Sequence, residues 1–160
     1  MSETAGTENT VVLEKLRSLI EINNRINLNF TNPDSLLVSV LESVMAIVKC
    51  ESGSIILAHR EDDILHFEIA LGPKSALLKK VKVDKNSIAG WVYKNKKSQI
   101  INSVKDDERF NDAVQIKTNY ITRNMIAFPM IVEDECLGVI ELLNKADDSD
   151  FTVSDMGILE

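Results

Sequence analysis

The sequence has few of the residues that mark several large protein classes. It has two cysteines, Cys50 and Cys136, without Cys-x-x-Cys or Cys/His spacing, which argues against a structural zinc site and a disulfide-stapled fold. It has 18 basic against 25 acidic residues, so it is a poor candidate for binding nucleic-acid phosphates. We therefore expect reduced thiols, a cytoplasmic location and no nucleic-acid polymer as a partner.

Long apolar runs and catalytic signatures are missing as well. The apolar run Met125–Val132 is among the longest and has eight residues, far fewer than the ~20 that cross a bilayer. Gly-x-Ser-x-Gly, His-Glu-x-x-His, Walker-type and Gly-x-Gly-x-x-Gly motifs do not occur. We predict no membrane segment in this sequence and no enzyme activity.

The length and composition fit one globular domain, because 44% of the 160 residues are apolar and 27% are charged. We expect a disordered tail at 1–10 and a domain at 31–160 that is truncated within its last helix. At 11–30 the apolar residues recur at helical spacing, with Asn23 in the same seam. This segment is predicted to be a dimerising helix, since a polar seam residue can fix register. The alternative is a helix lying on its own domain. The apolar seam consists of Val12, Leu16, Leu19, Ile26 and Phe30.

The remaining chain switches between helical and strand periodicity. A helix is expected from Asn32-Pro33-Asp34 to Val48, since Asn caps helices well and Pro suits their first position. Further helices are expected after Ser87 up to Lys97, and at 112–117. Pro129 indicates a bulge or an edge position in its strand. This order favours an α+β fold with a mostly antiparallel sheet. The predicted strands are Ser54–His59, Leu65–Leu71, a short one at Val81 and Val83, Gln99–Ile101, Met125–Val132 and Leu137–Leu143.

Isolated reactive side chains carry weak signals. His59 and His66 form a pair without a supporting carboxylate pattern, so we expect them near solvent rather than on a metal. The two cysteines are expected to be small apolar fillers rather than nucleophiles. The acidic run at 106–108 matches no calcium loop. No metal site is predicted.

One constellation is more specific. Asn144-Lys145 ends a predicted strand, and Phe151 and Asp155 follow where the last helix should begin. At this spacing Lys145 and Asp155 can reach each other and latch the strand to the helix. Thr152 and Asp155 also resemble a capping box, with Asp in the usual Glu or Gln position.

These residues resemble a known motif. Asn144-Lys145…Phe151…Asp155 resembles the Asn-Lys…Phe…Asp-Glu motif of GAF domains that bind cyclic nucleotides in phosphodiesterases and cyanobacterial adenylyl cyclases. Here Met156 replaces the final Glu of that motif. The resemblance implies a six-stranded antiparallel sheet flanked by helices, with a ligand pocket beside a variable helical segment. Further matching segments, in the family's order, are Ser87–Val92, Asp107–Phe110, Thr122–Met125, Phe128-Pro129 and Leu137–Leu142.

The resemblance also implies a set of ligand-contacting positions. The helix start at Ile88 and Ala89 suits an anionic phosphate, because its backbone N–H groups are free. Hydroxyls of the variable segment can donate to phosphate or ribose oxygens. The family's base-reading carboxylate aligns with Gln115, and an Asp after the second strand aligns near Leu71. An amide can pair with adenine, which favours cAMP over cGMP. The implied ligand-binding residues are Ser54, Ile88, Ala89, Gln115, Thr118, Thr122 and Glu141.

The function implied is a regulatory sensor that binds cAMP or cGMP, with no other cofactor. It would form a homodimer through its N-terminal helix and control an effector in the same chain, such as a cyclase or phosphodiesterase. Three alternatives stay open. These are a dimerisation module without ligand, a sensor of haem, a bilin or a small metabolite, and a GAF-type free methionine sulfoxide reductase. The last would need a cysteine cluster, which two distant cysteines do not resemble.

Overall fold

The computed structural model describes residues 33–59, 64–79 and 81–159. The predicted tail at 1–10 and the predicted helix at 11–30 lie outside these residues. The elements are α2 Pro33–Val48, β1 Cys50–His59, β2 Ile64–Leu71, η1 Ser75–Leu77, β3 Lys82–Val83, α3 Ile88–Asn95, β4 Gln99–Ile101, η2 Val104–Asp106, α4 Ala113–Thr118, β5 Met125–Val132, β6 Glu135–Lys145, η3 Ala146–Asp148 and α5 Val153–Met156.

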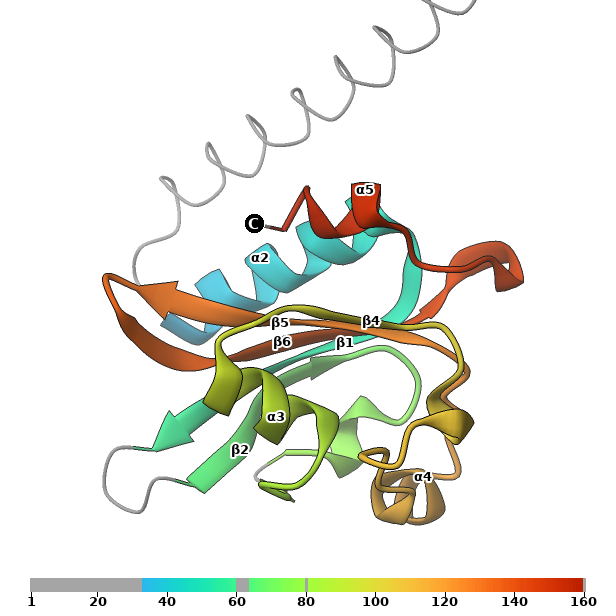
Figure 1. The fold of residues 1–160 in the computed structure, drawn as a ribbon, viewed down its shortest axis with the longest axis horizontal. Coiled ribbons are helices and arrows are strands. Elements are labelled where there is room, and N and C mark those ends of the chain that lie inside the picture. The colour runs from blue at the N-terminus through green and yellow to red at the C-terminus, as the bar shows by residue number, and fades with distance from the viewer. Residues whose placement is uncertain (1–32, 60–63, 80, 160) are drawn as a thin grey trace, which may run out of the picture.

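The strands form one six-stranded sheet with the order β3-β2-β1-β6-β5-β4. Every neighbouring pair is antiparallel. Helices α2 and α5 cover one face of the sheet, while α3 and α4 lie on the other (Figure 1). The predicted fold, an α+β domain with a six-stranded antiparallel sheet flanked by helices, is confirmed.

Each face of the sheet has its own apolar core, because side chains alternate between faces along a strand. On the face of α2, Leu41 and Val48 pack against residues of β1, β5 and β6, including Ile55 and Leu142. On the opposite face, α3 contributes Ile88, Ala89 and Val92, and the strands contribute Ile56, Phe67, Met125 and Val139.

Strand β2 departs from the prediction. Strict alternation from Leu65 to Leu71 would put all its apolar residues on one face. Instead Phe67 packs in the α3 core and Ile69 in the α2 core. The register with β1 shifts between Ile55, which pairs with Ile69, and Ile56, which pairs with Phe67. This bulge moves the apolar side of the strand to the other face, so one strand serves both cores.

Several strand boundaries also differ from the prediction, most of all at β1 and β6. Strand β1 begins at Cys50 rather than Ser54, since Lys49 takes a left-handed conformation (φ 59°) that turns the chain directly from α2 into the strand. Strand β6 extends to Lys145 and so contains the Asn-Lys pair. Both extensions lengthen the β1–β6 ladder, in which Cys50 pairs with Lys145.

Pro129 lies on an open edge, as predicted. Strand β4 pairs with Met125–Ala127 of β5, and within the part of the chain that the structure describes the rest of β5 pairs with β6 alone. The register shift in β5 falls between Met130 and Ile131, one residue beyond the proline.

Candidate functional site

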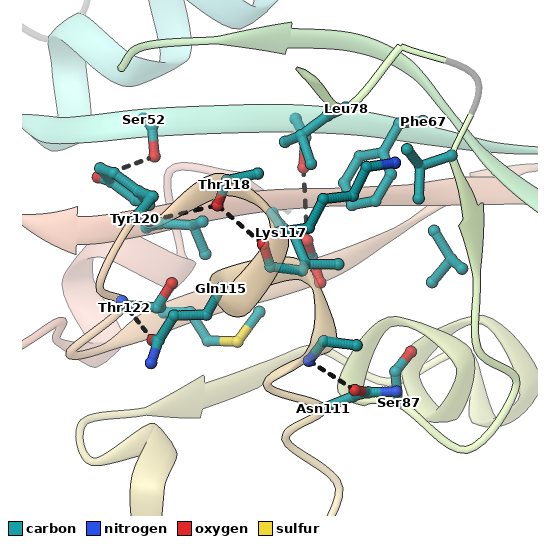
Figure 2. Close-up of a pocket in the computed structure, with 18 of the residues that line it drawn as sticks. Ser52, Phe67, Leu78, Ser87, Asn111, Gln115, Lys117, Thr118, Tyr120 and Thr122 are labelled. Atoms are coloured by element: carbon teal, nitrogen blue, oxygen red, sulfur yellow. Dashed lines mark hydrogen bonds between the residues drawn. The ribbon is translucent and has the colours of Figure 1, made fainter. Parts of the chain in front are cut away.

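A cavity of about 260 Å³ lies on the α3 and α4 side of the sheet. This volume is close to the lower end of the roughly 300–1,000 Å³ typical of small-molecule sites. Strands β1, β2 and β6 form one wall of the cavity. The start of α3 and residues 113–122, which we call the α4 segment, form further walls. Figure 2 shows Tyr120 reaching Ser52 on β1, with Thr118 beside it and Gln115 and Thr122 on the other side of the segment.

Six of the seven residues predicted to bind ligand line this cavity: Ser54, Ile88, Gln115, Thr118, Thr122 and Glu141. Ala89 does not. It is 1% exposed and packs in the core beneath α3. The next residue of a helix is turned by about 100°, so Ile88 can border the cavity while Ala89 points into the core.

A serine and a glutamate lie on the sheet side of the cavity. Ser54 and Glu141 are direct partners in the β1–β6 ladder, and the Ser54 hydroxyl donates to Oε2 of Glu141 at 3.4 Å. Burial raises the pKa of the Glu141 carboxyl to about 7, and the bond from Ser54 only partly offsets this. Near neutral pH the carboxyl therefore exists in both forms, and its protonated form can also donate a hydrogen bond.

The N-terminus of α3 borders the same cavity through Ser87 and Ile88. The Ser87 side chain caps the helix by accepting from the Gly90 N–H at 3.2 Å. A Cβ at Gly90 would lie 2.2 Å from the Lys85 carbonyl oxygen, so only glycine permits this close turn. The first N–H groups of a helix have no partner within it, which makes this end favourable for an anion.

Side chains of the α4 segment form hydrogen bonds with the backbone of the same segment. Oε1 of Gln115 accepts from the backbone N–H of Thr122 at 3.1 Å. The Thr118 hydroxyl donates to the Val114 carbonyl at 2.8 Å and accepts from the Tyr120 N–H at 3.3 Å. The hydroxyl proton of Thr118 is thus engaged within the segment, and donation of this hydroxyl to a ligand stays a prediction. Gln115 offers its amide N–H₂ more freely than its oxygen.

Basic side chains line the cavity that the sequence analysis did not single out. They are Lys74, Lys82, Lys117 and Arg109. The guanidinium of Arg109 is already paired with Asp107 at 2.7 Å and lies over the Trp91 ring at 5.0 Å. The three lysines therefore supply the positive charge available to a ligand. Lysines are common on surfaces, so nothing in the sequence marked these three.

Tyr120 connects the cavity wall to the Asn-Lys motif. Its hydroxyl accepts from Ser52 at 3.1 Å and from Nδ2 of Asn144 at 3.0 Å, and it donates to Glu51 at 3.2 Å. Asn144 is 1% exposed, and its Oδ1 accepts from the Arg123 N–H at 2.8 Å. The side chain of Asn144 thus ties the chain after α4 to strand β6.

Lys145, the residue after Asn144, forms the predicted latch, an ion pair with Asp155. Nζ of Lys145 donates to Oδ1 of Asp155 at 2.7 Å and to the Val48 carbonyl at 2.6 Å. It therefore joins the end of α2 to the start of α5. Asp155 also completes a capping box with Thr152. Phe151 precedes α5 rather than opening it, and its buried ring lies 5.7 Å from Lys145 Nζ.

The isolated candidates form no further site within the described ranges. The His59 and His66 rings lie 4.5 Å apart, and His59 is 3.8 Å from Glu68. No group of three possible metal-ligating side chains occurs among residues 33–59, 64–79 and 81–159. Burial raises the pKa of the Cys50 thiol to about 12 and also raises that of Cys136. Both thiols are therefore protonated near neutral pH and are weak nucleophiles. In the same ranges, no helix combines the length and apolarity that a membrane crossing requires.

The sequence matches one family model and parts of longer proteins. The family model for the GAF domain matches residues 32–160. A probable 3′,5′-cyclic phosphodiesterase of Caenorhabditis elegans is 24% identical over 151 residues, which is 88% of this chain and 21% of that protein. The alpha′ subunit of the Bos taurus cone cGMP-specific 3′,5′-cyclic phosphodiesterase is 38% identical over 68 residues, which is 42% of this chain and 8% of that subunit. The chain thus spans about a fifth or less of these relatives.

Solved structures share the fold. The GAF domain from a phosphoenolpyruvate-protein phosphotransferase of Coxiella burnetii has a TM-score of 0.80 at 13% identity, covering 92% of this chain and 86% of that one. The free methionine-R-sulfoxide reductase from Neisseria meningitidis has a TM-score of 0.73 at 14% identity, covering 91% and 81%. At such identities the likeness concerns the fold alone, and function has to come from the residues of the site.

Proposed function

The chain belongs to the GAF domain family, and on this premise we propose that it is a regulatory sensor domain that binds a cyclic nucleotide. The observation that carries the proposal is the composition of the cavity. The cavity lining combines the N-terminal end of helix α3 and three lysines with apolar side chains such as Phe67, Val114 and Met125. A cyclic nucleotide has an anionic phosphate and a flat, largely apolar base. The helix end and the lysines suit the phosphate, and the apolar side chains suit the base.

The identity of the base is a finer question with two candidates. The sequence favours cAMP, because an amide at Gln115 can pair with adenine. Adenine pairing needs both ends of the amide, and Oε1 of Gln115 already accepts from Thr122. Guanine presents N–H donors on its Watson–Crick edge, and an ionised Glu141 could accept them. The names of the phosphodiesterase relatives that specify cGMP agree with this second candidate.

The route from the cavity to the effector is part of the proposal. Tyr120 lines the cavity and contacts Asn144, and the adjacent Lys145 holds the ends of α2 and α5. A ligand that prefers one position of Tyr120 would therefore bias both helices. We further propose a cytoplasmic homodimer with an effector domain in the same protein and no catalysis by this domain.

Calorimetric titration of the chain, freed of co-purified nucleotide, tests the binding proposal. We expect saturable binding of one cyclic nucleotide. Lys117→Ala should weaken it about tenfold, as expected for losing one charge-assisted contact of ~1.4 kcal/mol. Lys105→Ala is the matched control, since Lys105 is an exposed lysine on η2 that does not line the cavity.

Either of two results would count against this proposal. Absence of heat and of any thermal shift with both nucleotides, for folded protein, would leave a dimerisation module or a sensor of another ligand. An equal loss in both lysine variants would mean that overall charge, rather than the cavity, attracts the nucleotide.

A second experiment tests the route through Tyr120. Tyr120→Phe removes the hydroxyl that Asn144 and Ser52 contact, so we expect a stability loss of about 1 kcal/mol. The ligand should still bind, with a Kd within about threefold of the original. Ligand-induced protection of residues 145–156 from amide hydrogen exchange should decrease clearly. Undiminished protection in this variant would show that the signal takes another path.

A further inference from the structure

One carboxylic acid lies on the sheet wall of the cavity. Glu141 on β6 is half-buried, and its ladder partner Ser54 donates to Oε2 at 3.4 Å. Among the described residues, β1, β2, β5 and the rest of β6 add only serines, a glycine and apolar side chains to the lining. An ionised carboxyl has about four lone pairs, and Ser54 takes one of them. The carboxyl can therefore still form hydrogen bonds with a ligand.

The charged groups of the cavity lie on other elements. Within the described ranges, β1, β2, β5 and α3 contribute no charged side chain to the lining. Burial raises the pKa of Glu141 to about 7, the bond from Ser54 lowers it, and none of the lining charges contributes to this shift. Since no cation holds the carboxyl in its ionised form, both forms are populated near neutral pH. The titratable groups that line the cavity besides Glu141 are Lys74, Lys82, Asp84, Arg109, Lys117 and Tyr120.

The two forms of a carboxyl offer different hydrogen-bond patterns. An ionised carboxyl only accepts, through two oxygens side by side, whereas a protonated one has a donor beside an acceptor. The Watson–Crick edge of guanine has two adjacent N–H donors, which match the ionised form. The same edge of adenine has a ring-nitrogen acceptor beside an amino donor, which matches the protonated form.

We propose that Glu141 determines which purine the cavity binds, selecting guanine when its carboxyl is ionised and adenine when it is protonated. Since a cyclic nucleotide must occupy the cavity, this role of Glu141 rests on the proposed function. The base rather than the phosphate meets the carboxyl, because the phosphate is attracted to the start of α3 and to the lysines and is repelled by a carboxylate. Oε1 of Gln115 already accepts from the Thr122 N–H, so this amide is less able to read the base.

The size of the effect follows from the ionised fraction of Glu141. For a pKa of about 7, this fraction rises from about 0.1 at pH 6 to about 0.9 at pH 8. A ligand that binds only one form has an apparent Kd inversely proportional to the fraction of that form. The Kd of cGMP should therefore fall about tenfold from pH 6 to pH 8, and that of cAMP should rise about tenfold. Neither nucleotide titrates in this range, so both changes come from the protein.

Calorimetric titration with cAMP and with cGMP at pH 6, 7 and 8 measures these Kd values. At pH 7, titration in two buffers of different ionisation enthalpy counts the protons exchanged. We expect release of about half a proton with cGMP and uptake of about half a proton with cAMP.

Two variants connect the pH dependence to Glu141. Glutamine has a donor beside an acceptor at every pH, so Glu141→Gln should bind cAMP without pH dependence and bind cGMP at least about tenfold more weakly at pH 8. His59→Gln is the matched control, since histidine also titrates in this range and His59 on β1 does not line the cavity. This control should keep both pH dependences.

Each other outcome overturns the proposed role of Glu141. Binding that does not vary with pH and exchanges no proton would show that the carboxyl does not read the base, and the sensor proposal would stand. Kd values that change in the same direction for both nucleotides would mean that the carboxyl meets a part common to them. Loss of the pH dependence in His59→Gln would assign the proton to that histidine. Absence of binding of both nucleotides at every pH would overturn this role together with the sensor proposal.

Discussion

Asp155→Asn is expected to lower the free energy of unfolding by about 3 kcal/mol, since removing one partner of a buried ion pair leaves the other charge uncompensated. The side chains of Lys145 and Asp155 are only 16% and 12% exposed. In the variant, the ammonium of Lys145 keeps the Val48 carbonyl but loses its carboxylate. Denaturant unfolding at neutral pH measures the difference.

Asp148→Asn is the matched control for the latch. Arg123 and Asp148 are 3.1 Å apart, but Asp148 is 84% exposed. An exposed pair contributes little, so the control should change stability by no more than about 0.5 kcal/mol. Equal effects of the two substitutions would contradict the idea that burial makes the latch important.

The latch should also depend on pH. Burial raises the pKa of Asp155, but hydrogen bonds from Lys145 and Thr152 outweigh it and bring the pKa below its usual value. A carboxyl with a lowered pKa contributes stability above its unfolded pKa of about 4, and this contribution is lost as the pH falls through the folded pKa. The difference between the original chain and Asp155→Asn should therefore shrink in acid.

Glu141→Gln is expected to stabilise the domain by about 3 kcal/mol at pH 8, provided that no ligand is bound. The pKa of the buried carboxyl is raised from 4.5 to about 7, and each unit corresponds to ~1.4 kcal/mol. Between these two values the folded state holds a proton that the unfolded state releases. The stability of the original chain therefore falls as the pH rises through this window. Glutamine has a similar shape and no charge, so the variant should lack this slope.

Denaturant unfolding at pH 4 and pH 8 checks the prediction for Glu141. The two proteins should be nearly equally stable at the lower pH and differ most at the higher. Glu42→Gln, at an exposed position on α2, should leave the slope unchanged. An unchanged slope in Glu141→Gln would mean that the cavity hydrates this carboxyl well enough to keep its pKa ordinary.

Local sequence signals account for most of the fold. The cap at Ser87, the capping box at Thr152 and the apolar runs of β5 and β6 are short-range features, and each is present in the structure. The ladder pairing of Ser54 with Glu141 is not among them, because it depends on the register of two strands that lie 87 residues apart in the sequence. The Lys145–Asp155 contact was predicted because its residues are close in sequence.

Features that depend on distant contacts were not predictable. The bulge in β2 depends on the register with β1, and the sequence of β2 alone does not indicate it. Tyr120 gains its role from Asn144 and Glu51, which lie 24 and 69 residues away. Gln115 was interpreted as a base reader from its alignment with the family's carboxylate, and the sequence does not show that its Oε1 accepts from the Thr122 N–H. Ala89 was named from a motif for the backbone N–H at the helix start, which stays a prediction; the sequence did not show that its side chain lies in the core.

The proline on the open edge of β5 has a consequence for behaviour in concentrated solution. Among residues 33–59, 64–79 and 81–159, no strand pairs with β5 beyond Ala127 on its β4 side. Such an edge can recruit the strand of another molecule and start end-to-end fibre growth. Pro129 has no N–H to offer an incoming strand, and the register shift after Met130 bends the edge away from a straight template. These two features of β5 therefore disfavour polymerisation through the edge of the sheet.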